Sequence, residues 1–288
     1  MYSLKKSLTQ TKKMKKAKVL FVSQEITPYV EANHLSTIGR YLPQGIQEKG
    51  REIRTFMPKY GTVNERRNQL HEVIRLSGMN LIIDDTDHPL IIKVASIQSC
   101  RMQVYFIDNE EYFQRKSLMT DETGAYHEDN DERSIFFCRG VIETVKKLGW
   151  SPDIIHCNGW ISAPMPILIK KVFNEDPLFA DTKVIYSIFD EEFSPALNKK
   201  FAQKIQMTGI SDADVKRVKD PTFSNLTKFA IDYSDGIIKG SMKISADIEK
   251  HLKASNKPVL AFQDPENYVA GFNEFYNTIL EETPALVE

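Results

Sequence analysis

Apolar residues along this chain fall into short continuous runs that alternate with longer stretches of helical spacing. Residues 19–22 form a run of four apolar side chains, which predicts a buried strand. Apolar side chains then recur every three or four positions over residues 35–46, which predicts an amphipathic helix ending near Gly50. Pro43 within this helix predicts a kink or a break. Residues 52–57 predict a second strand, so the chain opens as strand, helix, strand.

The segment from residue 70 to residue 108 has a different pattern. Four runs rich in β-branched residues are separated by short polar links, which predicts a β-meander or hairpin insertion at the edge of a sheet. These runs cover residues 71–76, 81–84, 90–95 and 102–107. Residues 109–128 are polar and predict a loop or a short helix.

Strands and helices alternate again after this segment. A long apolar stripe over residues 130–148 predicts a helix, with Asp129 as its N-cap. Strands are expected at 153–156, 183–188, 236–239 and 258–262, and helices at 160–172, 194–219, 223–234, 244–253 and 266–280. This order predicts a single α/β domain with a doubly wound, Rossmann-like parallel sheet.

Composition narrows the class of protein. Of the 288 residues, 41% are hydrophobic and 27% are charged, and the formal net charge is −1. Such a balance is typical of soluble globular proteins and gives no basic field for nucleic acid or an acidic membrane. The longest apolar runs are too short to span a bilayer. We therefore expect a soluble protein without a nucleic-acid or membrane partner.

Several common site motifs are absent from the sequence. No G-x-G-x-x-G loop occurs, and Gly45 and Gly50 are followed by Arg51 and Glu52 where a phosphate loop needs Lys and then Ser or Thr. The three cysteines form no C-x-x-C pair, which favours free thiols in a reducing cytoplasm over a disulfide frame or zinc site. The six histidines show no metal-ligand spacing. We expect no metal and no bound cofactor.

The first 13 residues contain four lysines and no acid. They lack the apolar core of a secretory signal, so we interpret them as a disordered basic tail. Translation from Met14 would leave this tail out, and a transit peptide is the alternative, although arginine is absent.

Three segments follow predicted parallel strands and so are expected at the ligand-binding edge of the sheet. They are residues 23–34, 156–160 and 187–192, and each carries groups that can bond a sugar or a phosphate. The alternative for each segment is an ordinary polar loop at a strand end.

The chain resembles bacterial glycogen synthases and plant starch synthases in several blocks that occur in the family's order. Val19-Leu-Phe-Val-Ser-Gln-Glu25-Ile-Thr-Pro28-Tyr is similar to the family's opening V-L-F-V-[SA]-[SA]-E-x-x-P-[FY]. The likeness continues from Leu42 to Gly61. It returns in the blocks Asp129-Asn-Asp-Glu-Arg133, Pro152-Asp-Ile-Ile-His156-x-x-x-Trp160 and Asn225-Leu-x-Lys228-x-x-Ile231-x-x-Ser-Asp235.

This resemblance implies the glycosyltransferase-B architecture, in which two Rossmann-like domains transfer glucose from ADP- or UDP-glucose to an α-1,4-glucan without a metal. It implies that residues 14–262 are the N-terminal, acceptor-binding half. We interpret residues 263–288 as a C-terminal helix that packs back on this domain. The family's linker to a donor-binding domain is not found before the chain ends.

The sequence departs from the family pattern where a sugar diphosphate would be held. The family's Lys-x-Gly-Gly-Leu-Gly-Asp is here Glu31-Ala-Asn-His-Leu35-Ser-Thr37, which places a carboxylate where the family has a cation. Contact with a diphosphate then changes from attraction to repulsion of about 1–4 kcal/mol. The family's His-Asp-Trp is here Asn158-Gly159-Trp160, and the family's Thr-x-His-Asn is Ser187-Ile-Phe189-Asp190.

From these observations we expect a noncatalytic or half-site relative that binds an α-glucan or oligosaccharide. It could also assist a full-length synthase or a separately encoded C-terminal half. The alternatives are an active glucosyltransferase, alone or completed in trans, and a scaffold without a sugar site. The candidate binding residues are Tyr29 and Trp160 as stacking platforms and Asp129, Asn130, Arg133, His156 and Asn158 as hydrogen-bonding groups. Their structural alternatives are a helix anchor for Trp160, an N-cap for Asp129 with Arg133 as its partner, and a core imidazole for His156.

Overall fold

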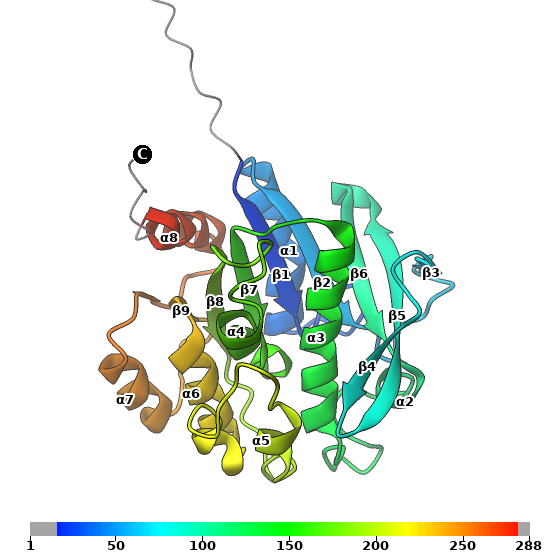
Figure 1. Ribbon diagram of the computed structural model, residues 1–288. Helices are drawn as coiled ribbons and strands as arrows, with labels where there is room; N and C mark the ends of the chain where they lie inside the picture. Colours follow the sequence, from blue (N-terminus) through cyan, green and yellow to red (C-terminus); the bar gives the residue numbers. More distant parts are fainter. Residues whose placement is uncertain (1–15, 282–288) are drawn as a thin grey trace, which may run out of the picture.

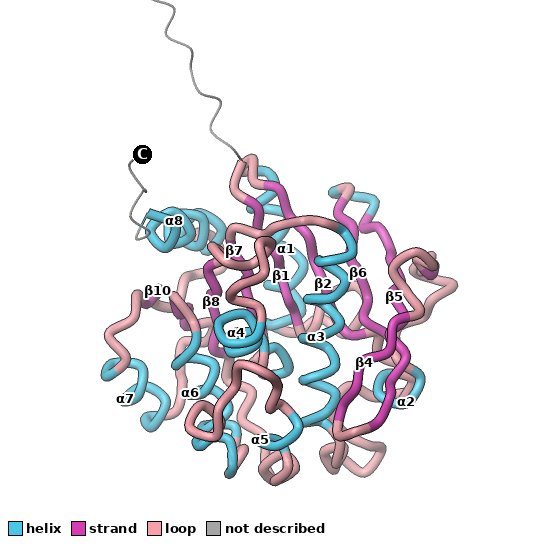
Figure 2. The backbone as a smooth tube through the Cα atoms, in the orientation of Figure 1, coloured by secondary structure: helices cyan, strands magenta, loops and turns pink. Residues whose placement is uncertain are grey.

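The computed structural model describes residues 16–281, so the predicted tail 1–13 and the last residues of the segment 263–288 lie outside the described residues. A ten-stranded sheet runs through the middle of the molecule, with helices on both faces (Figures 1 and 2). The strands are β1 (Lys18–Ser23), β2 (Glu52–Pro58), β3 (His71–Glu72), β4 (Met79–Ile83), β5 (Thr86–Ile97), β6 (Met102–Asp108), β7 (Ile154–Asn158), β8 (Lys183–Ile188), β9 (Gly236–Lys239) and β10 (Val259–Leu260). The helices are α1 (His34–Glu48), α2 (Glu110–Phe113), α3 (Asn130–Leu148), α4 (Met165–Ile167), α5 (Phe201–Lys204), α6 (Phe223–Tyr233), α7 (Ala246–Ala254) and α8 (Tyr268–Glu281).

The order of the strands confirms the doubly wound α/β prediction. The sheet runs β10-β9-β8-β7-β1-β2-β6-β5-β3, with β4 paired to β5. The chain builds outward from β1 through β2 to β6, returns to β7 on the other side of β1, and continues to β10. Strand order therefore reverses between β1 and β7, which pair in parallel with Ser23 beside Asn158. Ligands of open α/β sheets bind at such a switch point.

Alternate side chains of β1 enter two different cores. Val19 and Phe21 pack with apolar residues of α1 and α8, whereas Leu20 and Val22 belong to the larger core under α3, α4 and α6. This alternation follows from the two-residue period of a strand. On the α8 side, Gly236 leaves room for close packing, because a Cβ there would lie 2.6 Å from Ile279 Cδ1.

Several predicted elements differ from the structure. The predicted meander is antiparallel as expected, since β3 and β4 pair with β5 and β5 pairs with β6, but it is more than an edge insertion, because β6 also pairs in parallel with β2 and so joins the main sheet. The predicted strand over residues 71–76 is reduced to β3, and the strand over 258–262 to β10. The sequence pattern predicted these antiparallel strands but not the parallel pairing of β6 with β2, which depends on how the chain crosses over between those two strands.

Two predicted helices are interrupted in the structure, and proline or glycine lies in each of them. The expected helix over residues 160–172 is divided into a 3-10 turn, α4 and a π-helical turn, and Pro164 and Pro166 in this stretch lack the N–H that a continuous helix needs. Residues 194–219 hold only α5 and a short 3-10 turn, and Gly209, with φ of 101°, lies between them in a conformation that a helix does not contain. By contrast, α1 continues through Pro43 without a break.

Candidate functional site

Gln24 connects all three predicted strand-end segments. Its backbone N–H donates to the carbonyl of Asn158 at 2.9 Å, which continues the contact between β1 and β7 past the strands. Its side-chain amide donates to Glu191 Oε1 at 2.6 Å and to Glu25 Oε1 at 3.2 Å, and its Oε1 accepts from the backbone N–H of Ile161 at 3.3 Å. The loops after β1, β7 and β8 therefore meet around one buried glutamine.

Glu25 is held in place from the start of α1. Asn33 Nδ2 donates to Glu25 Oε2 at 2.5 Å. Asn33 is also the N-cap of α1: its Oδ1 accepts from the backbone N–H of Ser36 at 2.7 Å, and its own N–H donates to Ser36 Oγ at 2.9 Å. This reciprocal capping box fixes the entry of the loop into the helix, and with it the position of the Glu25 carboxylate.

Glu191 is an unusual acid in this cluster. Burial raises the pKa of its carboxyl group to about 8, and the negative charge of Glu25 acts in the same direction. The hydrogen bond from Gln24 acts in the opposite direction and lowers this pKa. At neutral pH Glu191 is therefore largely protonated and can donate a hydrogen bond as well as accept one.

Two cavities of about 240 and 590 Å³ open at this edge and share Glu25 and Asn33 as a common wall. The smaller one is also lined by His34, Asp190, Glu191 and Ser241. Glu31, the carboxylate that replaces the lysine of the family pattern, lines the larger one. Among the residues that the structure describes, no lysine or arginine lines either cavity. The imidazole of His34 lies 2.8 Å from the carbonyl of Gly240, so its Nε2 carries the proton and donates.

Asp129, Asn130 and Arg133 lie at the start of α3, but they contact one another and the adjoining loop. Asp129 occupies the N-cap position without a side-chain capping bond, so the N-cap prediction was wrong for its side chain. The carboxylate instead accepts two hydrogen bonds from Arg115, at 2.6 and 2.5 Å. This partnership lowers the pKa of Asp129, although burial acts against it.

Arg133 is fully buried, and its partner is Asn130 rather than Asp129. Its guanidinium donates to Asn130 Oδ1 at 2.6 Å and to the carbonyl of Tyr112 at 2.7 Å, and it lies over the rings of Tyr60 and Phe113. Burial lowers its pKa to about 10. Asn130 and Arg133 thus bond the segment before α3, through the carbonyls of Met119 and Tyr112, and line neither cavity.

His156 lies inside the core on the α8 face of the sheet. Its Nδ1 is 2.6 Å from the hydroxyl of Tyr276 in α8, and its Nε2 is 2.7 Å from Ser187 Oγ in β8. Burial lowers its pKa to about 3, so the ring is neutral. This is the core imidazole that the sequence offered as the structural alternative.

The two predicted stacking platforms are covered by protein. Tyr29 is 5% exposed and meets Phe106 edge-on, and Trp160 is 3% exposed and meets Phe193 edge-on. A sugar ring could reach the indole of Trp160 only if Phe193 moved. Tyr29 nevertheless lines the larger cavity.

Asn158 and Ser23 are the polar side chains at the ends of β7 and β1. Both are fully buried, and neither the two amide atoms of Asn158 nor the hydroxyl of Ser23 has a hydrogen-bond partner among the described residues. Buried polar groups normally have partners, so such exceptions at a switch point draw attention to function. Asn158 is the predicted binding residue that this observation favours.

The sequence analysis missed Gln24, Asn33 and Glu191 as site residues. All three lay within the predicted segments 23–34 and 187–192, and so did Glu25. No spacing rule marks a glutamine whose side chain bonds two glutamates. Within residues 16–281, no three His, Cys, Asp or Glu side chains converge in the way a metal site requires. In the same part of the chain, no helix has the length and apolarity to cross a membrane.

Comparison with known proteins gives consistent matches. The family described as starch synthase catalytic domain matches residues 18–256. A glycogen synthase of Chlorobium limicola is 40% identical over 197 residues, which cover 68% of this chain and 40% of that protein. A glycogen synthase of Chlorobaculum parvum is 34% identical over 239 residues, which cover 83% of this chain and 48% of that protein.

The fold has a counterpart among solved structures. It is similar to the catalytic domain of starch synthase IV from Arabidopsis thaliana bound to ADP and acarbose, with a TM-score of 0.70 and 18% sequence identity. The match covers 87% of this chain and 52% of that one. The chain therefore spans about half the length of the relatives it matches. With most of its length matched by the family and this fold in common, the chain belongs to the starch synthase catalytic domain family of glycosyltransferases.

Proposed function

We propose that this chain binds an α-glucan or oligosaccharide at the carboxyl edge of the sheet and does not by itself transfer glucose from a sugar nucleotide. One observation carries the proposal: carboxylates and amides line both cavities at this edge, and no lysine or arginine among residues 16–281 does. Stabilising a departing diphosphate requires cations or convergent N–H donors. Carboxylates that face a diphosphate act against it.

Neutral sugar hydroxyls suit the same groups well. Glu25 and Asp190 accept hydrogen bonds, Asn33 both donates and accepts, and the protonated Glu191 donates. The larger cavity, at about 590 Å³, is within the range of small-molecule sites. The solved relative from Arabidopsis was described with ADP and acarbose, which supports this fold as a place where such compounds bind.

The test combines binding and turnover on the purified chain. Binding of malto-oligosaccharides is measured by calorimetry, and transfer of labelled glucose from ADP-glucose and UDP-glucose onto glycogen is measured in parallel. Glu31→Lys and Glu122→Lys make the same charge change, and both side chains are exposed, but only Glu31 lines a cavity of the site. Saturable glucan binding that Glu25→Gln weakens, without label transfer, is the expected result.

Two outcomes contradict the proposal. Incorporation of label by the unmodified chain would show that it completes a donor site by itself. Absence of glucan binding by folded protein would remove the binding role. If transfer occurs only when Glu31→Lys is introduced, and not with Glu122→Lys, the charge at position 31 is the feature that disfavours the donor.

A partner role is tested by the same assay. Adding a full-length synthase, or a separate C-terminal half, shows whether transfer appears in trans. The scaffold alternative is distinguished by the same experiments, because a pure scaffold is expected to show neither glucan binding nor label transfer.

A further inference from the structure

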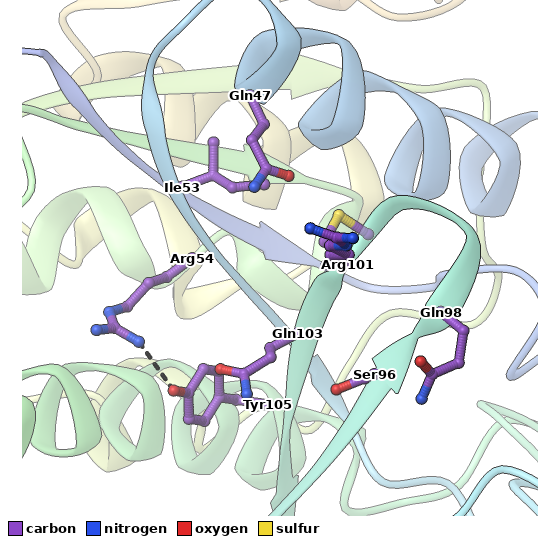
Figure 3. Close-up of a pocket in the computed structure, with 9 residues that line it drawn as sticks. Gln47, Ile53, Arg54, Ser96, Gln98, Arg101, Gln103 and Tyr105 are labelled. Atoms are coloured by element: carbon purple, nitrogen blue, oxygen red, sulfur yellow. Dashed lines mark hydrogen bonds between the residues drawn. The ribbon is translucent and has the colours of Figure 1, made fainter.

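A third cavity, of about 320 Å³, lies at the opposite edge of the sheet from the candidate site. It is located where β2 and β6 begin and where β5 ends, and Gln47 from the last turn of α1 closes it on one side (Figure 3). This edge carries the amino ends of the parallel strands. The proposed glucan site and this cavity are therefore separated by the length of the sheet.

The cavity results from a fork between two strands. β2 pairs with β1 from Glu52 onward, but it pairs with β6 only from Thr55, which lies beside Val104. On its other side β6 stays paired with β5, with Ser96 beside Gln103. The strands β2 and β6 thus diverge at Arg54 and Gln103, and the side chains at this divergence line a space that no sheet neighbour fills.

Two arginines line this space, and no carboxylate from the described part of the chain does. Neither Arg54 nor Arg101 takes part in an ion pair with any residue between 16 and 281. Arg101 ends the turn between β5 and β6, where its backbone has the left-handed conformation with φ of 52°. Its side chain lines the cavity. The closest acid along β2, Glu52, already accepts a hydrogen bond from Trp150 Nε1 at 2.5 Å.

Two aromatic rings and one hydrogen bond orient the guanidinium of Arg54, and they leave some of its N–H donors unused. Its guanidinium lies over the rings of Trp150 and Tyr105, with centroid distances of 5.3 and 5.7 Å, and donates one hydrogen bond to the Tyr105 hydroxyl at 2.8 Å (Figure 3). Its Nε is buried and has no acceptor within residues 16–281. A guanidinium has five N–H donors, so this group is oriented but not satisfied.

We propose that this fork binds a small phosphate ester whose remaining part carries hydroxyl groups, such as a sugar phosphate. Arg54 and Arg101 supply the planar charged donors that suit phosphate oxygens. The amides of Gln47, Gln98 and Gln103 supply neutral donors and acceptors for hydroxyl groups. The volume matches a ligand of this size. The proposal is independent of glucan binding, because it uses none of the residues at the carboxyl edge.

The experiment is a titration of the full chain with inorganic phosphate and with a hexose phosphate, followed by calorimetry and by amide NMR. Unphosphorylated hexose and chloride at equal ionic strength are the comparison ligands. Arg101→Gln is the principal variant, because its side chain is exposed and its loss should not affect folding. Arg66→Gln is the matched control, because it removes an exposed arginine that does not line the cavity. Arg54→Lys keeps the charge and removes the planar fork.

We expect saturable binding of the phosphate compounds, with shifts centred on residues 96–105, and at least a tenfold loss of affinity in Arg101→Gln and in Arg54→Lys. Arg66→Gln should bind as the unmodified chain does. The hexose phosphate should bind more tightly than phosphate alone. Chloride that competes equally, absence of saturable binding, or equal losses in Arg101→Gln and Arg66→Gln would each overturn the proposal. Glucan binding remains measurable in all these variants, so the two proposals fail separately.

Discussion

Gln24 occupies the space that a side chain at position 159 would need. A Cβ built on Gly159 would lie 2.7 Å from Gln24 Cβ and 2.8 Å from its Oε1. The family pattern has Ser or Ala at position 24 and Asp at position 159, so two departures of this sequence are in direct contact. Glycine at position 159 leaves the room that the Gln24 side chain uses to reach Glu25 and Glu191.

Gly159→Ala should destabilise the chain more than Gly124→Ala. Both glycines have φ of 86°, but a Cβ at Gly124 meets nothing within 4 Å. A positive φ by itself costs a non-glycine residue about 1–3 kcal/mol. Urea unfolding should show this loss at both positions and an added loss at position 159 from the contact with Gln24. Equal losses would mean that Gln24 moves aside freely.

His156 should make the stability of the chain depend on pH. Its pKa falls from 6.5 to about 3 on folding, so the unfolded chain binds the proton more readily. The stability contributed by neutral His156 is complete above pH 6.5 and is lost progressively as the pH falls towards 3. Between pH 7.5 and 5.5 this amounts to about 1 kcal/mol.

His156→Gln tests this contribution, because the amide can still bond Tyr276 and Ser187 but does not titrate. Urea unfolding at the two pH values should show a loss in the unmodified chain that is larger by about this amount. Parallel pH profiles for the two proteins would contradict a buried neutral imidazole.

Glu191 should titrate near neutral pH in the folded chain. Its pKa rises from 4.5 to about 8 on folding, so it favours the folded state below pH 4.5, and this contribution is lost as the pH rises through 8. A carbon-detected NMR titration of glutamate side chains would measure this pKa directly. In Gln24→Ala the pKa should rise further, because the hydrogen bond that favours the carboxylate is removed. A titration below pH 5 would show that the site is more open to water than this structure indicates.

Arg133→Ala should cost the chain about 3 kcal/mol or more, since it empties a buried position and removes a guanidinium that bonds Asn130 and Tyr112. Arg133→Met fills most of that volume and removes a buried charge with an unpartnered Nη2. It should cost less than the alanine variant in thermal or urea unfolding. If the two variants lose the same stability, the hydrogen bonds matter more than the volume.

The sequence predicted the strands of the main sheet well because each is a short apolar run with clear ends. β8, β9 and α3 have the bounds expected from the pattern. The switch point could also be predicted, because strand-end loops of a doubly wound sheet converge by topology. Residues 194–219 could not be predicted, because contacts such as those of Lys204 with Asp131 and Glu132 hold that segment together.

The candidate site was harder to predict than the fold. Residue type identified Tyr29 and Trp160 as aromatic platforms, but only the packing of Phe106 and Phe193 shows that their rings are covered. His156 was placed on the correct strand, yet its partner Tyr276 lies 120 residues away. Glu191 is distinctive only through the burial and neighbouring charge that set its pKa, and neither is visible in a single sequence.

The capped start of α1 has an electrostatic consequence. The helix begins at the carboxyl edge beside Glu25 and ends beside the fork, where Gln47 faces Arg54 and Arg101. The peptide dipoles of a helix place partial positive charge at its start and partial negative charge at its end. Side-chain charges at both ends of α1 therefore oppose the backbone field. At the start of α1, the acids offset the attraction that the helix dipole would exert on an anion. At the end of α1, the arginines offset the repulsion that the dipole would exert on it.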